Sequence, residues 1–285
     1  MVTLHEKASA FAERHRGPGI IVLPNAWDPG TAVVLAEAGF PFIATTSAGI
    51  AFAQGVPDGQ HLSRSRMLEI AAQIAAAVDV PVTADLEAGY GPRPEDVAAT
   101  VTGAVAAGVV GCNIEDSTGD RDRPLFELEL AAERIRAGAE AAAASGVPFV
   151  LNARVDPYLV RLGTPEENLA ESIRRANAYR EAGAGCLYVP VVTDPDAIRL
   201  LVREIDGPLN VLGAMGGADS ALSVANLEAL GVRRVSIGGS LAVAALALVR
   251  RAGAELREHG TFSYTRDAMS NTDANALMLR ALREA

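Results

Sequence analysis

Two carboxylates separated by one residue end a short apolar run of the chain. Asp85 and Glu87 follow residues 80–84, and Gly89 and Gly91 come soon after them. If a strand ran through both acids, their side chains would point to the same side, because side chains alternate along a strand. Neighbouring carboxylates repel each other unless a cation or a shared proton separates them. Oxygen ligands suit a hard ion such as Mg2+, so this segment predicts a metal site, although a solvated loop with two surface acids would show the same pattern.

Other predicted strands also end in charged side chains. Glu115 ends one apolar run and Arg154 ends the next. An arginine can hold a carboxylate or a phosphonate through two parallel hydrogen bonds, so Arg154 predicts an anionic substrate. A structural pairing of Arg154 with Asp156 or Glu115 is the alternative. Three acids at the ends of neighbouring buried strands are costly without a cation, and we therefore predict that Asp85, Glu87 and Glu115 hold a metal ion.

Small and amide side chains follow two further predicted strands, and we predict that they bind the substrate. Thr46, Ser47 and Ala48 come directly after the run 41–45. Their backbone N–H groups are free to bind a carboxylate if the chain turns there. The seventh predicted strand contributes Asn210, which we also assign to substrate binding.

Composition excludes several classes of function. The chain has 285 residues and a formal net charge of −10, which argues against nucleic acid and anionic membranes as partners. No apolar stretch reaches the roughly 18–20 residues that span a bilayer, and residues 1–16 do not resemble a secretory signal. The two cysteines, Cys112 and Cys186, lie in apolar runs. We expect them to be buried free thiols, which fits a cytoplasmic protein. The only lysine is Lys7, so a Schiff-base lysine at a strand end is excluded.

The elements that would position these residues alternate regularly. Short apolar runs are followed by polar or glycine-rich corners and then by amphipathic stretches, and this unit occurs eight times after Gly19. Eight strand–helix units in about 250 residues predict a closed (β/α)8 barrel of the TIM type; a doubly wound open sheet is the alternative. No composition break divides the chain, so we predict one domain over residues 1–285, with residues 264–285 as a C-terminal helical extension. The predicted strands are 20–23, 41–45, 82–85, 111–115, 149–153, 186–189, 209–212 and 232–237.

Five segments of the sequence resemble those of the phosphoenolpyruvate mutase/isocitrate lyase superfamily. They occur in the order of that family, and the acid–Gly–aromatic–Gly segment together with the later Asn-x-Glu-Asp is fairly specific. The resemblance implies a (β/α)8 barrel that binds Mg2+, with Mn2+ as an alternative ion, and acts on a small anionic 2-oxo acid. It also implies a C-terminal helix exchanged between subunits in a homodimer or homotetramer. The segments are Thr45–Gly49, Gly55–Asp58, Ala84–Gly91, Gly111–Asp116 and Asn152–Arg154.

The resemblance also implies roles for individual residues. Asp85 and Glu87 match acids that hold the metal directly or through water, and Glu115 matches the next acid of that shell. Arg154 matches the arginine that binds substrate, and the segment 46–48 matches the backbone that binds the substrate carboxylate. Asp58 matches an acid of the loop after the second strand. We therefore expect Asp58 or Glu115 to transfer protons, because neighbouring negative charge raises the pKa of a carboxyl group.

Two departures from the family pattern bear on the reaction. Glu87 stands where the family usually has Asp. The loop 117–125 has no Cys, Lys or His, whereas isocitrate and methylisocitrate lyases carry a Lys-Lys-Cys-Gly-His type of loop there. A true isocitrate lyase is therefore not expected. We predict a lyase or decarboxylase that cleaves a C–C bond through an enolpyruvate-like intermediate; the alternatives are a phosphonomutase or phosphonopyruvate hydrolase that breaks a P–C bond, and a catalytically silent barrel scaffold.

Overall fold

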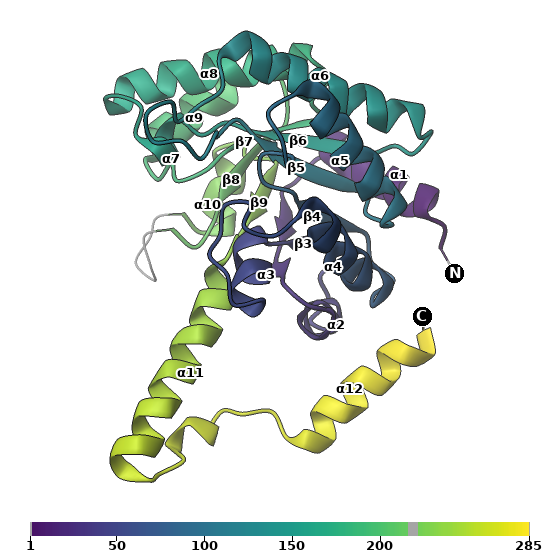
Figure 1. Ribbon diagram of the computed structural model, residues 1–285, viewed down its shortest axis with the longest axis vertical. Coiled ribbons are helices and arrows are strands. Elements are labelled where there is room, and N and C mark those ends of the chain that lie inside the picture. Colours follow the sequence, from purple (N-terminus) through teal and green to yellow (C-terminus); the bar gives the residue numbers. More distant parts are fainter. Residues whose placement is uncertain (1, 216–221, 285) are drawn as a thin grey trace.

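The computed structural model describes residues 2–215 and 222–284, and its centre is a parallel β-barrel (Figure 1). Within these residues the sheet has nine strands, which pair in the order β1-β9-β8-β7-β6-β5-β4-β3-β2. All the pairings are parallel. The strands are β1 (Ile21–Leu23), β2 (Asn25–Ala26), β3 (Ile43–Thr45), β4 (Val82–Asp85), β5 (Gly111–Glu115), β6 (Val150–Arg154), β7 (Cys186–Val189), β8 (Leu209–Leu212) and β9 (Arg234–Ser236).

The barrel closes because β1 and β2 are two halves of one strand. Pro24 lies between them and has no N–H group to donate to a ladder. Its carbonyl oxygen still accepts a hydrogen bond from the Ala44 amide at 2.9 Å. The first half pairs with β9 and the second half pairs with β3. The eight predicted strand positions are therefore confirmed as a (β/α)8 barrel, and the open-sheet alternative is wrong.

Helices alternate with the strands as predicted, and several of them begin at caps that the sequence supplies. Thr164 and Glu167 form a capping box at the start of α8, and Pro165 occupies its first turn, where a missing N–H group costs nothing. The helices are α1 (Leu4–Arg16), α2 (Pro29–Glu37), α3 (Ser47–Ala53), α4 (Arg64–Ala76), α5 (Pro94–Ala106), α6 (Leu128–Ala144), α7 (Pro157–Val160), α8 (Pro165–Glu181), α9 (Pro195–Glu204), α10 (Val224–Ala229), α11 (Ser240–His259) and α12 (Asn271–Glu284), with a 3-10 turn η1 (Ser263–Thr265) before α12. None of the helices in these residues is long and apolar enough to cross a membrane.

The inside of the barrel is apolar at one end and polar at the other. Phe11 of α1 packs with inward side chains such as Leu23 and Val150 and closes the N-terminal end. Above this plug, Asn152 donates to Asn113 across neighbouring strands at 2.6 Å. The strand ends beyond this layer carry the charged side chains predicted from the sequence. Cys112 and Cys186 are buried free thiols, as predicted.

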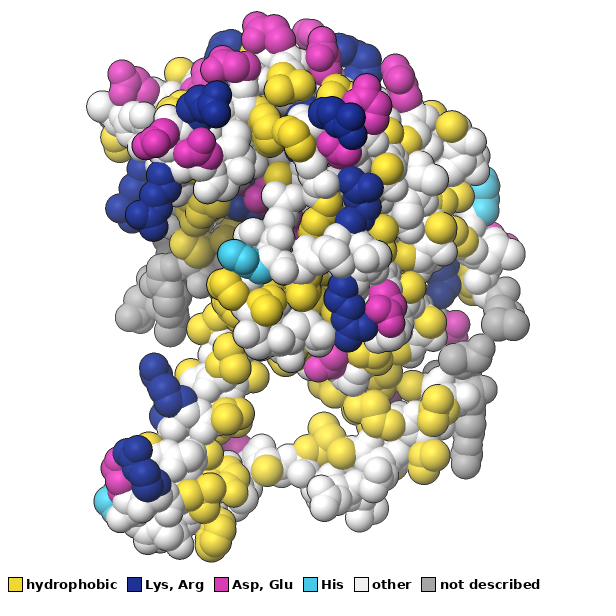
Figure 2. All heavy atoms as spheres, viewed as in Figure 1, with side chains coloured by type: hydrophobic (Ala, Val, Ile, Leu, Met, Phe, Trp, Pro, Cys, Tyr) yellow, Lys and Arg dark blue, Asp and Glu magenta, His cyan; other side chains and the backbone are white. Residues whose placement is uncertain are grey.

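The C-terminal helices form an arm that extends from the barrel and returns to it (Figure 1). Leu277 of α12 is buried in the chain's own core, and Arg280 pairs with Glu37 of α2 at 2.5 Å. Other apolar side chains of α11 and α12 stay exposed along the arm (Figure 2), among them Val249, Leu279 and Leu282. The helical extension is thus present and touches its own barrel, and its exchange between subunits stays a prediction.

Candidate active site

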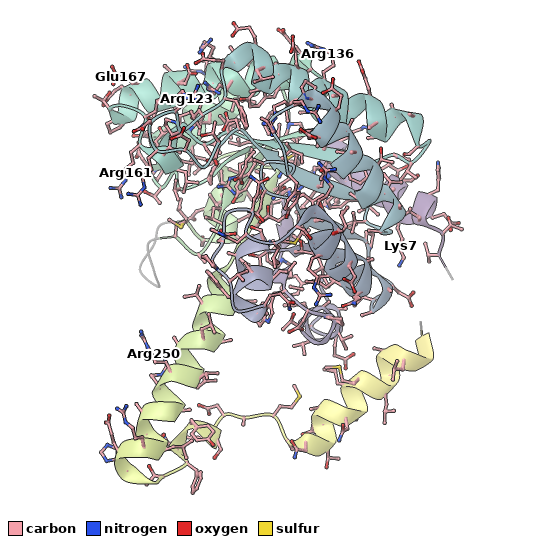
Figure 3. All side chains as sticks on the ribbon, viewed as in Figure 1. Lys7, Arg123, Arg136, Arg161, Glu167 and Arg250 are labelled. Atoms are coloured by element: carbon pink, nitrogen blue, oxygen red, sulfur yellow. The ribbon has the colours of Figure 1, made fainter. Side chains whose placement is uncertain are left out.

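A small cavity of about 170 Å3 lies at the C-terminal ends of the barrel strands. It brings together six residues that the sequence assigns to the site, from the ends of β3, β4 and β6 and the loop before α4. They are Thr46, Ser47, Ala48, Asp58, Asp85 and Arg154. Lys7 lies far from these strand ends (Figure 3) and donates instead to the Val78 carbonyl oxygen at 3.2 Å. The exclusion of a lysine-dependent aldolase therefore agrees with the structure.

Asp85 ends β4 with one carboxylate oxygen engaged and the other without a partner. Its Oδ2 accepts hydrogen bonds from the Ser47 amide at 3.1 Å and from the Ser47 hydroxyl at 2.9 Å. Its Oδ1 is buried and has no hydrogen-bond partner in the described part of the chain. A buried carboxylate oxygen without a partner is costly. Asp85 therefore lines the cavity and keeps one carboxylate oxygen that no described residue engages.

Asp58 stands at the exposed rim of the same cavity. The pKa of its carboxyl group is raised, first because the cavity wall removes part of its solvation and then because Asp85 is negatively charged. A hydrogen bond from Ser47 opposes the rise. A carboxyl group whose pKa moves toward neutrality is suited to proton transfer, which agrees with the role expected for Asp58.

Glu87 does not share the direction of Asp85, because β4 ends at Asp85. The backbone of Glu87 has a φ of 51°, in the left-handed region, so the alternation that would place both acids on one side does not apply. Its side chain accepts hydrogen bonds from the Gln60 amide and, at 3.1 Å, from the Tyr90 hydroxyl. Burial, and then the negative charge of Asp85, raise the pKa of Glu87 to about 7.

Glu115 is engaged by Arg154 in an ion pair of 2.5 Å. Arg154 also contacts Asp156 at 2.7 Å through Nε, so both structural pairings considered from the sequence occur. Burial raises the pKa of Glu115 well above its usual value, although the charge of Arg154 opposes this. Burial also works against the charge of Arg154, but Asp156 and Glu115 outweigh it and raise the pKa of the guanidinium.

The segment after β3 is a short helix that the sequence did not predict. Thr46 caps α3, and its hydroxyl accepts from the Gly49 amide at 3.4 Å. Because the Ser47 amide already donates to Asp85, this backbone first serves to hold Asp85. Ser47 and Ala48 still line the cavity, as does Thr46.

Asn210 lies below the cavity instead of in its wall. Its side chain is fully buried and donates to the Ser236 hydroxyl at 3.4 Å, so the structure does not bring it to the predicted substrate side. Sequence reasoning missed Asn113 and Ser236, which do line the cavity. Asn113 is a polar position between Cys112 and Ile114 of β5, and this was an available signal, whereas Ser236 follows Arg234 and Val235 and gave no such signal.

The predicted metal carboxylates are not gathered into one ligand set. In residues 2–215 and 222–284 no three His, Cys, Asp or Glu side chains are grouped so that they could hold a metal ion. A hydrated Mg2+ needs only one or two carboxylates, because this ion keeps several of its waters. The Oδ1 of Asp85 has no partner among the described residues, and burial, followed by the negative charge of Asp85, raises the pKa values of Glu87 and Asp58. The residues therefore fit such an ion with Asp85 as the ligand.

Glu87→Gln is expected to stabilise the metal-free protein at high pH. Burial raises the pKa of Glu87 from 4.5 to about 7, so the folded state holds a proton that the unfolded state releases. The contribution of Glu87 to the free energy of unfolding is therefore greatest below pH 4.5, and it is lost as the pH rises through about 7. Such a rise corresponds to about 3 kcal/mol, and we expect a gain of about 1–3 kcal/mol at pH 8.

Urea unfolding at pH 8 and pH 5 measures this difference. The gain at pH 5 should be much smaller, because Glu87 is then protonated in the folded state. Glu13→Gln makes the same change on the exposed face of α1 and should alter neither value. An equal gain at both pH values would contradict the assignment.

Comparisons with known proteins show clear likeness along the whole barrel. Residues 11–257 match the sequence model of the family described as phosphoenolpyruvate phosphomutase. The chain is 28% identical over 286 residues to the probable 2-methylisocitrate lyase 1 of Corynebacterium glutamicum, which covers 98% of this chain and 91% of that protein.

Solved structures agree with the sequence match. The crystal structure of a putative lyase/mutase from Burkholderia cenocepacia has a TM-score of 0.90 and 45% identity, over 96% of this chain and 95% of that one. A phosphonopyruvate hydrolase in complex with oxalate and Mg2+ has a TM-score of 0.83 and 28% identity, over 98% and 96% of the two chains. These relatives are named for cleavage of both C–C and P–C bonds.

Proposed function

The chain belongs to the phosphoenolpyruvate mutase/isocitrate lyase superfamily, and from this premise we propose that it is a Mg2+-dependent enzyme that cleaves a C–C bond of a small 2-oxo or 2-hydroxy acid. The cleavage would pass through an enolpyruvate-like intermediate. The observation that carries the proposal is Asp85, which lines a cavity with Arg154 and Asp58 and whose buried Oδ1 has no hydrogen-bond partner among the described residues. The superfamily relative with oxalate and Mg2+ supports the choice of ion and of a small dicarboxylate-like ligand.

The metal would be held by Asp85. Glu87 is engaged by Gln60 and Tyr90 and Glu115 by Arg154 in this structure, so these two acids would reach the ion only through water. When bound, Mg2+ supplies a Lewis acid that polarises the 2-oxo group and stabilises developing negative charge on it. Glu87 is poised by its contacts with Gln60 and Tyr90, and it loses its proton as the pH rises through about 7. Metal binding would then favour the ionised carboxylates.

Arg154 and Asp58 would act on the substrate itself. The guanidinium of Arg154 lines the cavity and is fixed by Glu115 and Asp156, so it can bind an anionic group without reorganising. Asp58 would accept or donate a proton at the carbon or hydroxyl group that reacts, since its pKa is raised and it lies at the cavity rim. Glu115 is the alternative proton carrier.

The cavity wall favours C–C over P–C cleavage. Among the described residues that line it, Arg154 is the only cationic side chain, and Asp58 and Asp85 are negatively charged; the others are neutral polar, apolar or glycine residues. A phosphonate carries more negative charge than a carboxylate and would need further partners. The apolar lining residues are Ala48, Leu159, Pro190, Val191 and Leu212.

Metal-dependent turnover of candidate acids tests the proposal. The purified protein with MgCl2 should cleave oxaloacetate at least about tenfold more efficiently than phosphonopyruvate, a difference of about 1.4 kcal/mol in the barrier. 2-Methylisocitrate, whose lyases carry the missing Cys loop, should be a poor substrate. Excess EDTA should abolish the reaction. Preference for phosphonopyruvate would establish the P–C alternative. The absence of both turnover and Mg2+ binding would leave the scaffold alternative.

A further inference from the structure

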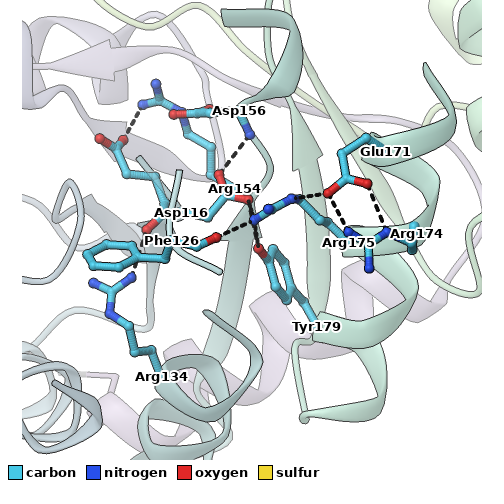
Figure 4. A network of polar contacts seen from close by, with 10 residues as sticks. Asp116, Phe126, Arg134, Arg154, Asp156, Glu171, Arg174, Arg175 and Tyr179 are labelled. Carbon is cyan, nitrogen blue, oxygen red and sulfur yellow. Dashed lines mark hydrogen bonds and ion pairs between the residues drawn. The ribbon is translucent and has the colours of Figure 1, made fainter. Parts of the chain in front are cut away.

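A buried carboxylate outside the cavity collects three hydrogen bonds (Figure 4). Asp116 follows β5 and is 2% exposed. It accepts from the Tyr179 hydroxyl at 2.7 Å and from Arg175 Nη1 at 3.2 Å, both of α8. It also accepts from the Asp156 amide at 2.9 Å. One carboxylate thus joins α8 to the segment that follows β6.

The bond to the Asp156 amide connects this carboxylate to the cavity. The Asp156 side chain is fully buried and holds Arg154 Nε at 2.7 Å. In turn, Arg154 Nη1 contacts Glu115, and Arg154 lines the cavity. The position of the Asp156 backbone therefore determines where the Arg154 guanidinium lies, and Asp116 holds that backbone.

The same residues fix one end of the loop that follows β5. Arg175 Nη1 donates to the Phe126 carbonyl oxygen at 2.9 Å, and the Phe126 amide donates to the Asp116 carbonyl oxygen at 2.9 Å. The Arg134 guanidinium stacks over the Phe126 ring at 3.9 Å. Asp116 and Phe126, which flank the loop 117–125, are therefore both held by hydrogen bonds, next to the segment that positions Arg154.

Stability alone does not require this charge network. Replacing a buried ion pair with apolar side chains of similar volume is often neutral or stabilising, because the cost of removing two charges from water can exceed their mutual attraction. A packed barrel with apolar outer strand faces could fill this space with hydrophobic side chains. A fixed network is useful where a charged side chain has to be held in one orientation.

We propose that Asp116, Arg175 and Tyr179 are positioning residues that seat Arg154 for the anionic end of the substrate. They touch neither the cavity nor the reacting atoms and act through Asp156. The identity of the ligand rests on the proposed function, whereas the seating of Arg154 does not. The residues that determine the geometry of the site would then include side chains of α8, which lies behind the cavity wall.

Oxalate binding in the presence of Mg2+ tests the proposal in solution. Tyr179→Phe removes one hydrogen bond to Asp116 and keeps the ring in place, and Arg175→Met removes the cation. Calorimetric titration should show oxalate Kd raised about 5–20-fold by the first and about 10–100-fold by the second, since hydrogen bonds to charged groups are the stronger class. Arg203→Met is the matched control, because Arg203 forms an exposed ion pair with Glu204 on α9 and shares no partner with Arg175 in the described residues.

A double-mutant cycle separates positioning from general loosening of the fold. In an Arg154→Lys background, Tyr179→Phe should change oxalate Kd by less than about twofold, because the residue it acts through is gone. An unchanged effect in that background would overturn the proposal. So would variants that lower Tm but bind oxalate as the wild type does.

Crystal structures of the variants keep the test independent of the reaction. If the wild-type protein binds no oxalate with Mg2+, the proposed function fails, and the position of Arg154 then decides the inference. An Arg154 guanidinium that leaves Asp156 in Tyr179→Phe or Arg175→Met supports the positioning role. A guanidinium that stays on Asp156 and Glu115 in both variants overturns it.

Discussion

Asp85→Asn is expected to abolish Mg2+-dependent turnover, with a fall in kcat/KM of about a thousandfold or more, which is about 4 kcal/mol. The substitution removes a charge and almost no volume. The new side chain can still accept from the Ser47 amide and hydroxyl through its oxygen, as Oδ2 does now. The amide nitrogen would then take the place of the free Oδ1. An NH2 group cannot be a ligand of Mg2+, so the fold should survive while the metal site is lost.

Mg2+ titration and steady-state kinetics on the same protein preparation measure this effect. Asp79→Asn makes the same chemical change on an exposed residue that precedes β4, at the opposite end of the strand. It should leave both the metal affinity and kcat/KM close to the wild-type values. If Asp85→Asn kept turnover within tenfold of the wild type and still responded to Mg2+, Asp85 would not be the metal ligand.

The barrel could be predicted from the sequence because its signals are local and repeated. The bounds of β4, β5, β7 and β8 agree with the predicted strands, since each is a short apolar run flanked by turn residues. The sequence also predicts a helix over residues 220–230. In the structure α10 starts at Val224, and residues 220 and 221 lie outside the described residues. The split of the first strand at Pro24 was missed, although the missing N–H group of proline is visible in the sequence.

The geometry of the acids could not be predicted in the same way. Glu87 has a positive φ, which is uncommon for a residue with a Cβ atom and has no sequence signal of its own. Its turn is held by contacts with Gln60, which is 27 residues away in the chain. Pairings of this kind decide which carboxylate keeps a free oxygen. The sequence predicted which segments meet, and the long-range hydrogen bonds determine which atoms remain available.

The partners of Arg154 could not be decided from the sequence either. The sequence offered Glu115 and Asp156 as alternative partners, and the structure shows that the guanidinium holds both. Two partners on one arginine consume much of its hydrogen-bonding capacity, yet they also fix its plane. A fixed plane is what bidentate recognition of an anion requires. The structural and functional readings of Arg154 are therefore compatible.

Arg154→Lys is expected to lower kcat/KM by about a hundredfold to a thousandfold, or roughly 3–4 kcal/mol. Lysine keeps the positive charge that Glu115 and Asp156 need, so the buried carboxylates stay compensated and the protein should fold. A single ammonium group cannot reproduce the planar fork that now spans Glu115 at 2.5 Å and Asp156 at 2.7 Å. It would settle between the two acids and leave the substrate anion with a weaker partner.

Steady-state kinetics and thermal unfolding of the same variants separate this loss from a loss of folding. Arg203→Lys makes the same change at an exposed ion pair of α9 and should leave kcat/KM unchanged. Arg154→Met removes the charge as well, and breaking a buried pair in this way costs about 3–5 kcal/mol of stability. A lysine variant that folds and keeps full activity would show that Arg154 only neutralises Glu115 and Asp156, because the fork geometry would then have no part in catalysis.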